Sequence, residues 1–421
     1  MDMKQILTIV AACVLSVSAW AADGVKVTVQ NPLNHDRTDE MVEIDAAALR
    51  RRLKTEGSLV VTDADGHEVP SQVTWNGRLI FQPAVGAKAK SVYYVKAGQP
   101  QPYESRVHGR QFPERVDDMA WENDLVAFRT YGPALQRSGE RAWGYDIWNK
   151  RTERLVIEDR YALELDPEVA NVSRKLRKMG RDALAQELYY AVSYHVDHGN
   201  GMDCYKVGPT LGAGTTAVLA ANGQEIVYPK CYTAYEILDR GPLRFTVRLT
   251  YEKTQIEGNT VTETRLITLD AGSHMNRCVV TYDGLPQKWP IATGIIVHNE
   301  NPSAYVLNPK AGYMGYEDLG DVNQYREAWR EQLNKDFGRI YVGTVCTSQP
   351  CEMAFRQGEG LPGAIGHILA TTAWQPRTAY TYYFGTAWSR NPRTDFQRLA
   401  DWEAYLSRFA EHTRQPLKVN F

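Results

Sequence analysis

The chain has 421 residues and a formal net charge of −2, and its Lys and Arg residues are scattered along it. This composition excludes the positive field that a nucleic-acid-binding surface of ordinary kind requires. Tyr and Trp, at 24 and 10 residues, outnumber the 10 Phe. Rings with a flat apolar face and a polar edge suit sugars, although an aromatic-rich β core explains the same composition.

The amino terminus has the layout of a secretory signal. Lys4 precedes an apolar run from Ile6 to Val17, and Ala19-Trp20-Ala21 fits the rule for signal cleavage. We therefore expect residues 1–21 to be removed before Ala22 and the protein to be periplasmic. The lipobox-like Val10-Ala11-Ala12-Cys13 is the alternative, a lipoprotein. No other segment approaches the 18 apolar residues of a membrane span.

Residues 22–98 are predicted to form a small immunoglobulin-like β-sandwich domain. Short alternating strands are separated by turn residues, and Ala46 to Leu53 is the one helical stretch. The expected strands are Val25–Val29, Ser58–Thr62, Ser71–Trp75, Leu79–Phe81 and Ser91–Val95. Asp65-Gly66 and Asn76-Gly77 are typical hairpin turns. Gln99-Pro-Gln-Pro102 breaks the pattern and is the predicted linker.

Residues 103–421 are predicted to form one large domain. Its strand-like runs follow one another at hairpin spacing without βαβ alternation, which favours a large antiparallel β-sandwich of the mutarotase-like supersandwich kind. The runs are Ala217–Ala221, Glu225–Tyr228, Leu243–Tyr251, Thr260–Leu269, Cys278–Asp283, Gly294–His298, Arg339–Val345, His367–Thr372 and Ala379–Gly385. The fold class is therefore all-β.

A few peripheral helices are expected in this domain, over 173–188, 322–335 and 395–412. In the last, Thr394 is the predicted N-cap, and an apolar stripe at steps of three and four indicates a face that docks on the sandwich. Cys346-Thr-Ser-Gln-Pro-Cys351 is a tight turn between strands, so we expect a disulfide across it.

One glycine-containing loop, from Tyr194 to Gly208, is the densest group of candidate catalytic side chains. Glycines let the backbone approach a ligand closely, and clustered titratable groups are what acid–base chemistry needs. Its candidate residues are His195, His198, Asp203, Tyr205 and Lys206. A polar loop whose His and Asp residues satisfy one another is the alternative.

The sequence predicts no bound metal, since it has no Cys-x-x-Cys pair and His195-x-x-His198 is a weak pattern outside a helix. It predicts no other cofactor, and it has no Walker loop, nucleophile elbow or dinucleotide fingerprint. A divalent ion held by His195, Asp197, His198 and Asp203 is the alternative.

A second candidate stretch, from Phe112 to Gly132, mixes acids with an indole. Arg129 and Tyr131 share one face of a predicted strand, and an Arg is suited to hold a carboxylate with two hydrogen bonds. Trp121 and Glu122 are candidate substrate contacts. Simple pairing of Arg129 with a neighbouring acid is the alternative. His298 and Trp388, at the ends of predicted strands, complete the candidate binding residues, with Trp388 as a stacking platform for a sugar.

Five segments spread over nearly the whole mature chain resemble an uncharacterised-domain family of bacterial polysaccharide-utilisation loci. They are Asn31-Pro-Leu33, Glu114–Asp124, Tyr131–Leu135, Asp197–Gly208 and Tyr382–Trp388. The family is similar to a group of oligosaccharide dehydratases of ulvan breakdown. The resemblance implies that the chain removes water from a terminal uronic acid and leaves a 4,5-unsaturated sugar. An acidic oligosaccharide is then the expected partner.

Elimination of this kind needs a base at C5, donors for the enolate and an acid for the leaving oxygen. The sequence hypothesis assigns His195 or His198 as base, Tyr205 as acid and Arg129, with Lys206, as carboxylate clamp; Asp203 orients a histidine. Two alternatives stay open: another sugar-ring enzyme, namely an epimerase or a hydrolase with Glu122 in its carboxylate pair, and a non-catalytic glycan-binding protein. The sequence sets no oligomeric state.

Overall fold

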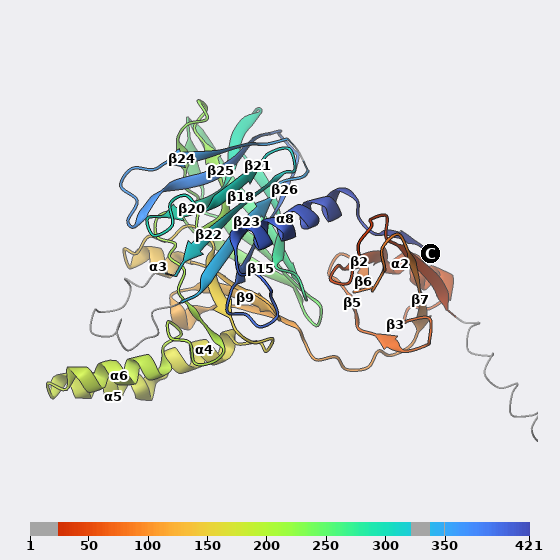
Figure 1. Cartoon of the computed structure of the whole chain (residues 1–421), viewed down its shortest axis with the longest axis horizontal. Helices are drawn as coiled ribbons and strands as arrows, with labels where there is room; N and C mark the ends of the chain where they lie inside the picture. The colour runs from red at the N-terminus through yellow and green to blue at the C-terminus, as the bar shows by residue number, and fades with distance from the viewer. Residues whose placement is uncertain (1–23, 321–336, 349) are drawn as a thin grey trace, which may run out of the picture. The chain divides into compact units, whose positions relative to one another are not determined.

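The computed structural model describes residues 24–320, 337–348 and 350–421, which divide into two compact units (Figure 1). Unit 1 holds the described residues up to Glu104 together with Pro416–Phe421, and unit 2 spans Ser105–Gln415. Strands predominate in both units, which confirms the all-β class. The predicted signal segment and the predicted helix over 322–335 lie outside the described residues. Within those residues, no helix is long and apolar enough to cross a membrane.

Unit 1 is a sandwich of two antiparallel sheets, ordered β27-β1-β7-β3-β4 and β2-β6-β5, with one helix, α2. The bounds are β1 Val25–Gln30, β2 Val42–Asp45, α2 Ala46–Leu53, β3 Leu59–Thr62, β4 Glu68–Val69, β5 Ser71–Val73, β6 Arg78–Phe81, β7 Lys90–Ala97 and β27 Lys418–Asn420. The predicted helix is confirmed residue for residue. Asp45 caps it, because the Asp45 side chain accepts a hydrogen bond of 2.9 Å from the amide of Ala48.

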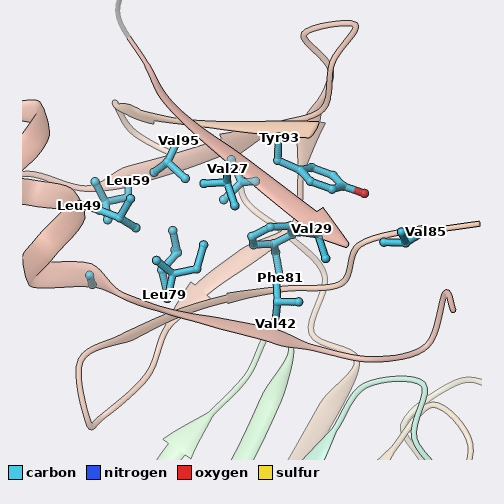
Figure 2. Packing of buried hydrophobic residues seen from close by; sticks show 13 residues of the cluster. Val27, Val29, Val42, Leu49, Leu59, Leu79, Phe81, Val85, Tyr93 and Val95 are labelled. Carbon is cyan, nitrogen blue, oxygen red and sulfur yellow. The ribbon is translucent and has the colours of Figure 1, made fainter. Parts of the chain in front are cut away.

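The core of unit 1 lies between the two sheets (Figure 2). Val27 and Val29 of β1 point inward at every second position and meet Phe81 of β6, as the period of a half-buried strand requires. The C-terminal strand was assigned to the large domain by the sequence prediction, which is wrong for these residues. Val419 of β27 pairs with Val29 and packs against this core.

Unit 2 contains three antiparallel sheets. The first has the order β12-β11-β10-β9-β8, with β8 Val107–Phe112, β9 Asp118–Asn123, β10 Ala127–Thr130, β11 Asp146–Lys150 and β12 Gly201–Asp203. The second has the order β14-β13-β20-β25-β24, with β13 Ala213–Leu219, β14 Ile226–Val227, β20 Trp289–His298, β24 Glu352–Gln357 and β25 Ala364–Trp374.

The third sheet of unit 2 has nine strands, in the order β15-β16-β18-β19-β26-β23-β22-β21, with β17 paired to β18. Their bounds are β15 Tyr232–Arg240, β16 Arg244–Tyr251, β17 Thr254–Ile256, β18 Asn259–Asp270, β19 Met275–Asp283, β21 Tyr305–Asn308, β22 Tyr313–Leu319, β23 Arg339–Val345 and β26 Tyr380–Trp388. The strand runs expected from the sequence fall within these elements, at boundaries shifted by a few residues.

Both five-stranded sheets pack on the same face of the nine-stranded sheet. The ring of Tyr145, beside β11, stacks on Phe384 of β26 with 4.2 Å between centroids. Phe384 also contacts β13, because a Cβ on Gly214 would lie only 2.9 Å from it. An isolated parallel bridge between Tyr145 and Gly212 joins the two five-stranded sheets. The predicted large antiparallel sandwich is therefore confirmed.

The helices of unit 2 lie at its periphery (Figure 1). They are the 3₁₀ turn η1 Pro113–Arg115, α3 Pro133–Arg137, α4 Ile157–Glu164, α5 Pro167–Lys178, α6 Asp182–Val192 and α8 Leu399–Arg414. The prediction of one helix over 173–188 is wrong. Gly180 has a φ of +69°, and a residue in the left-handed region ends a helix, so α5 and α6 form an antiparallel hairpin.

Helix α8 docks on the sandwich as its apolar stripe predicts. Trp402 and Leu406 are fully buried against β22 and β23, where a Cβ on Gly343 would lie 2.7 Å from Leu406. The predicted N-cap is wrong: Thr394 lies ahead of the helix, and Arg398 is the N-cap residue. The Asp401 carboxylate caps instead, accepting the Arg398 amide at 3.0 Å.

The expected disulfide between Cys346 and Cys351 is not formed. Both residues are free thiols, and the Cys351 Sγ lies 3.9 Å from the carbonyl oxygen of Cys346. Cys346 is buried at the end of β23, where its Sγ accepts a hydrogen bond of 3.2 Å from the Tyr380 hydroxyl.

Candidate functional site

The first group of buried ionic side chains, the Arg129 cluster, consists of Arg129, Asp118, Asp146 and Asp203. Arg129 of β10 lies opposite Asp146 of β11 in the strand register. Its Nε donates to Asp146 at 2.8 Å, and its Nη2 donates to Asp146 and, at 2.9 Å, to Asp203 of β12. The carboxylate of Asp118 on β9 is 3.6 Å away. Four adjacent strands therefore place three carboxylates around one guanidinium.

These carboxylates are hard to ionise together, because all three are buried. Burial and, after it, the nearby Asp203 charge raise the pKa of Asp146 to about 6 against the opposing effect of Arg129. Burial also raises the pKa of Asp203 and of Asp118. Tyr131 donates its hydroxyl to Asp146 at 2.8 Å. One cation among three acids thus leaves Asp146 to titrate close to neutral pH.

His195 lies over this cluster, so part of the Tyr194–Gly208 loop lies beside the Phe112–Gly132 stretch. Its Nδ1 is 3.0 Å from the carbonyl oxygen of Asp203 and 3.7 Å from the Asp203 carboxylate. Burial lowers the pKa of His195, which favours a neutral ring with Nδ1–H donating to that carbonyl. His198 lies apart, on the exposed side of the loop, with Nε2 3.0 Å from the carbonyl of Ser193.

A second group, the His298 cluster, consists of His298, Asp318, Tyr316, Tyr205 and Lys206. His298 is the last residue of the buried strand β20, and Asp318 and Tyr316 lie on the same side of β22. The His298 Nδ1 is 2.9 Å from one carboxylate oxygen of Asp318, and the Tyr316 hydroxyl donates to the other at 3.2 Å. The carboxylate thus fixes the orientation of the imidazole ring.

Tyr205 faces this imidazole from the loop after β12. Its ring meets the His298 ring edge to face, with 5.8 Å between centroids and 70° between the planes. The Tyr205 hydroxyl is buried and has no hydrogen-bond partner in the described part of the chain. A buried hydroxyl without a partner costs about 1–3 kcal/mol, so such a group calls for an explanation, and a catalytic role is one.

The two pKa shifts in this cluster suit different tasks. Burial opposes the charged form of His298, but the charge and the hydrogen bond of Asp318 outweigh it, so the pKa of His298 is raised. Burial, followed by the charge of Asp318, raises the pKa of Tyr205 well above its ordinary value. The phenol therefore keeps its proton at neutral pH, while the imidazole is a stronger base than a free histidine.

Lys206, half-buried, lies beside the cluster against the backbone of Gly363. A Cβ on Gly363 would lie 2.8 Å from the Lys206 ammonium nitrogen. The carbonyl of Gly363 accepts the amide of Asn299, the residue after His298, at 3.1 Å. Glycine at this position, with φ of +72°, therefore leaves the space in which the Lys206 side chain lies.

Two of the expected binding residues, both tryptophans, pack in the core and do not face a substrate. Trp121 is fully buried, and its Nε1 donates to Asn276 at 2.8 Å. Trp388 is also buried, with its indole N–H on the carbonyl of Phe337 at 2.7 Å. Neither ring is open for stacking on a sugar, so these two predictions are corrected.

Glu122 is fully buried and paired with Lys150 at 2.7 Å. Its second oxygen accepts the amides of Val156 and Ile157, which start α4. A carboxylate held by a buried cation and a helix N-terminus is not a substrate contact, so this prediction is corrected as well.

Sequence reasoning missed Asp146, Asp318 and Tyr316. Asp146 lies in the apolar strand-like run 145–148, and Tyr316 and Asp318 lie in the run 313–319, which also contains Glu317. An acid in such a run was the available signal for the two Asp residues, since buried charges are normally paired. Their partners are distant in sequence, and a single sequence does not reveal them.

The alternative of a metal held by the Tyr194–Gly208 loop finds no matching arrangement. Among the described residues, one group of three acidic or His ligands has its ligand atoms within 4.8 Å of one another, and it is Asp63, Asp65 and His67 in unit 1. In the loop, Asp197 instead accepts the amides of Gly199 and Gly201 and shapes the turn.

Comparisons with known proteins were made for the whole chain. A protein of Formosa agariphila named uncharacterized protein P7 is 26% identical over 444 residues, which cover 99% of this chain and 100% of that protein. The solved structure of an alpha-mannosidase of Enterococcus faecalis V583 matches with a TM-score of 0.46 and 10% sequence identity. The structure of a second Enterococcus faecalis protein, in the glycosyl hydrolase family 38, matches with a TM-score of 0.47 and 8% sequence identity. They cover 99% and 95% of this chain, which spans about half (48%) of each.

The family model described as "Domain of unknown function (DUF4861)" matches residues 29–419. Because that match covers nearly the whole described chain, including both clusters, the protein belongs to the DUF4861 family.

Proposed function

We propose that this protein is a carbon–oxygen lyase that eliminates water from uronic-acid-containing oligosaccharides, and that the His298 cluster is its active site. The observation that carries the proposal is the buried Tyr205 hydroxyl, which has no partner in the described residues and faces an imidazole oriented by Asp318. A base and an acid with separated pKa values are what β-elimination needs on the two sides of one sugar ring.

His298 is the proposed base. With Nδ1 directed at Asp318, the Nε2 atom is the one that accepts the C5 proton of the uronate. The Asp318 carboxylate stabilises the imidazolium that forms, in the way that a buried carboxylate supports a catalytic histidine. We prefer His298 to His195 because the Asp318 charge raises the pKa of His298, whereas burial lowers that of His195.

Tyr205 is the proposed acid. The C5–H and C4–O bonds break and a C4=C5 double bond forms; the C5 proton goes to His298 and the Tyr205 proton goes to the departing 4-oxygen, which leaves as water. Return of the proton from His298 to Tyr205 through solvent restores both groups. The raised pKa of Tyr205 keeps this proton in place before the reaction.

Lys206 is the proposed carboxylate contact, in place of Arg129. Arg129 is buried and already paired with three acids. An ammonium beside the uronate carboxylate lowers the energy of the charge that develops on it when the C5 proton leaves. The resemblance to oligosaccharide dehydratases supports the same reaction, and the hydrolase alternative is weakened because Glu122 is sequestered.

Incubation of the protein with uronate oligosaccharides tests the proposal through the ultraviolet absorbance of the unsaturated product. We expect a steady rise that is lost with His298→Ala and reduced at least about 100-fold with Tyr205→Phe. His67→Ala, an exposed change in unit 1, is the control and should retain the full rate. New reducing ends without absorbance would indicate hydrolysis, and binding alone a glycan-binding protein; either result would refute elimination. If His195→Ala abolished the rise in absorbance and His298→Ala did not, the active site would lie at His195 rather than in the His298 cluster.

A further inference from the structure

A basic, apolar-tipped helical hairpin distinguishes one end of unit 2. Helices α5 and α6 pack against each other and extend away from the sheets (Figure 1). Although α5 has an apolar stripe, none of its residues is buried. Val172, Leu176 and Met179 fall on one side of it at helical spacing, so α6 covers this stripe only in part.

Exposed apolar side chains concentrate on this hairpin. Eight large apolar side chains are strongly exposed in the described part of the chain, and three lie here: Met179 at 71%, Leu184 at 50% and Val172 at 45%. Met179 is at the tip, beside the Gly180 turn. Single exposed apolar residues are ordinary, whereas a group of them at a projecting tip indicates a contact surface.

The same tip is strongly cationic in a chain whose net charge is −2. Its cations are Arg174, Lys175, Arg177, Lys178 and Arg181, all exposed, and Asp182 is the single acid between Val172 and Leu184. None of these five forms an ion pair among the residues that the structure describes. A helix C-terminus carries about half a negative charge, which accounts for one such cation rather than five.

We infer that the α5–α6 hairpin docks on an anionic lipid surface. Cations attract the headgroups, and aliphatic side chains at the tip enter the interface, which is the combination that peripheral membrane helices use. A second copy of this chain is disfavoured, because it would bring five cations against five. An acidic polysaccharide would satisfy the charges but leave Val172, Met179 and Leu184 in water, and the tip has no aromatic ring for a sugar. The inference is independent of the proposed elimination.

Co-sedimentation with vesicles tests it, using the full chain and comparing phosphatidylglycerol-containing with pure phosphatidylcholine vesicles. We expect binding to the anionic vesicles alone, weakening as salt is added. Arg177→Glu with Lys178→Glu should lower the partition coefficient at least about twenty-fold, and Met179→Ser with Leu184→Ser should lower it several-fold. Lys253→Glu with Lys310→Glu changes the net charge equally on other exposed residues and should leave binding unchanged.

Because every variant carries the same N-terminal segment, a difference between them reports on the hairpin. Loss with both hairpin pairs and retention with the control pair supports the inference. Failure to bind anionic vesicles, indifference to either hairpin pair, or an equal loss in the control overturns it. Hairpin-dependent retention on immobilised polyuronate without vesicle binding also overturns it and assigns the hairpin to acidic polysaccharide.

Discussion

At the residue scale, the contact between His298 and Asp318 makes the proposed base dependent on pH in a defined direction. The pKa of His298 is raised above its ordinary 6.5 by Asp318, so the neutral, active form is lost as pH falls through that raised value. We expect kcat/KM to rise with pH along a limb centred above 6.5. Asp318→Asn should lower the rate and move this limb toward acid, because the charge that raises the pKa is gone. A limb that stays in place in Asp318→Asn would contradict the assignment.

Arg129 gives a stability prediction at the same scale. Its replacement by Leu leaves Asp118, Asp146 and Asp203 buried without their common cation. Removal of one partner from a buried ionic group costs about 3–5 kcal/mol, and we expect a loss of that size in urea unfolding. Arg174→Leu, on the exposed face of α5, should stay within about 0.5 kcal/mol of the parent. Equal stability of the two variants would show that the Arg129 cluster is not a structural network.

The pKa of Asp146 sets the sign of a related pH effect. Because this acid holds its proton more tightly when folded, with a pKa of about 6 against 3.8, the folded state binds more protons between these values. Its contribution to stability is therefore present below about pH 4 and is lost as pH rises through about 6. Asp146→Asn should remove this part of the pH dependence, measured as the difference between the two unfolding free energies at pH 4 and pH 7. An unchanged difference would contradict the shift.

At the scale of elements, the last strand gives a prediction about unit 1. β27 pairs with β1, and Leu417, Val419 and Phe421 pack against the unit 1 core. A chain ending at Gln415 loses these partly buried side chains, which together contribute about 2–4 kcal/mol. We expect amide exchange to quicken in β1 and β7 while β18 and β19 of unit 2 keep their protection. Uniform exchange in both units would contradict the assignment of β27 to unit 1.

At the scale of the whole molecule, local sequence patterns predicted most of the helices and strands, but they could not predict contacts between residues that are distant in sequence. Asn76-Gly77 favours a hairpin because Gly77, with a φ of +74°, closes the short turn between Thr74 and Arg78, so β5 and β6 were found. The joining of Val419 to Val29 spans almost the whole chain and has no local signal. The break between α5 and α6 at Gly180 also had no decisive local signal, because a glycine within a helical pattern is compatible with a continuous helix or with a turn.

The residues of the candidate site also divide into those that the sequence identified and those that only the fold identifies. Arg129, Asp203, Tyr205, Lys206 and His298 were named from residue type and neighbourhood, and the structure places each in one of the two clusters. Trp121 and Trp388 have the same residue type as a sugar platform but pack in the core, because burial depends on the facing sheet rather than on the flanking sequence. The role proposed for Asp318 depends on its contact with His298. The two residues lie on different strands, β22 and β20, which only the fold brings together.

A crystal structure of Tyr205→Phe with a bound uronate disaccharide tests the central claim most directly, because this variant should bind without turning over. The account predicts the uronate ring in the His298 cluster, with C5 about 3–3.5 Å from the His298 Nε2, its 4-oxygen toward position 205 and its carboxylate at Lys206. A disaccharide bound at His195, or anywhere that leaves C5 out of reach of His298, would contradict it.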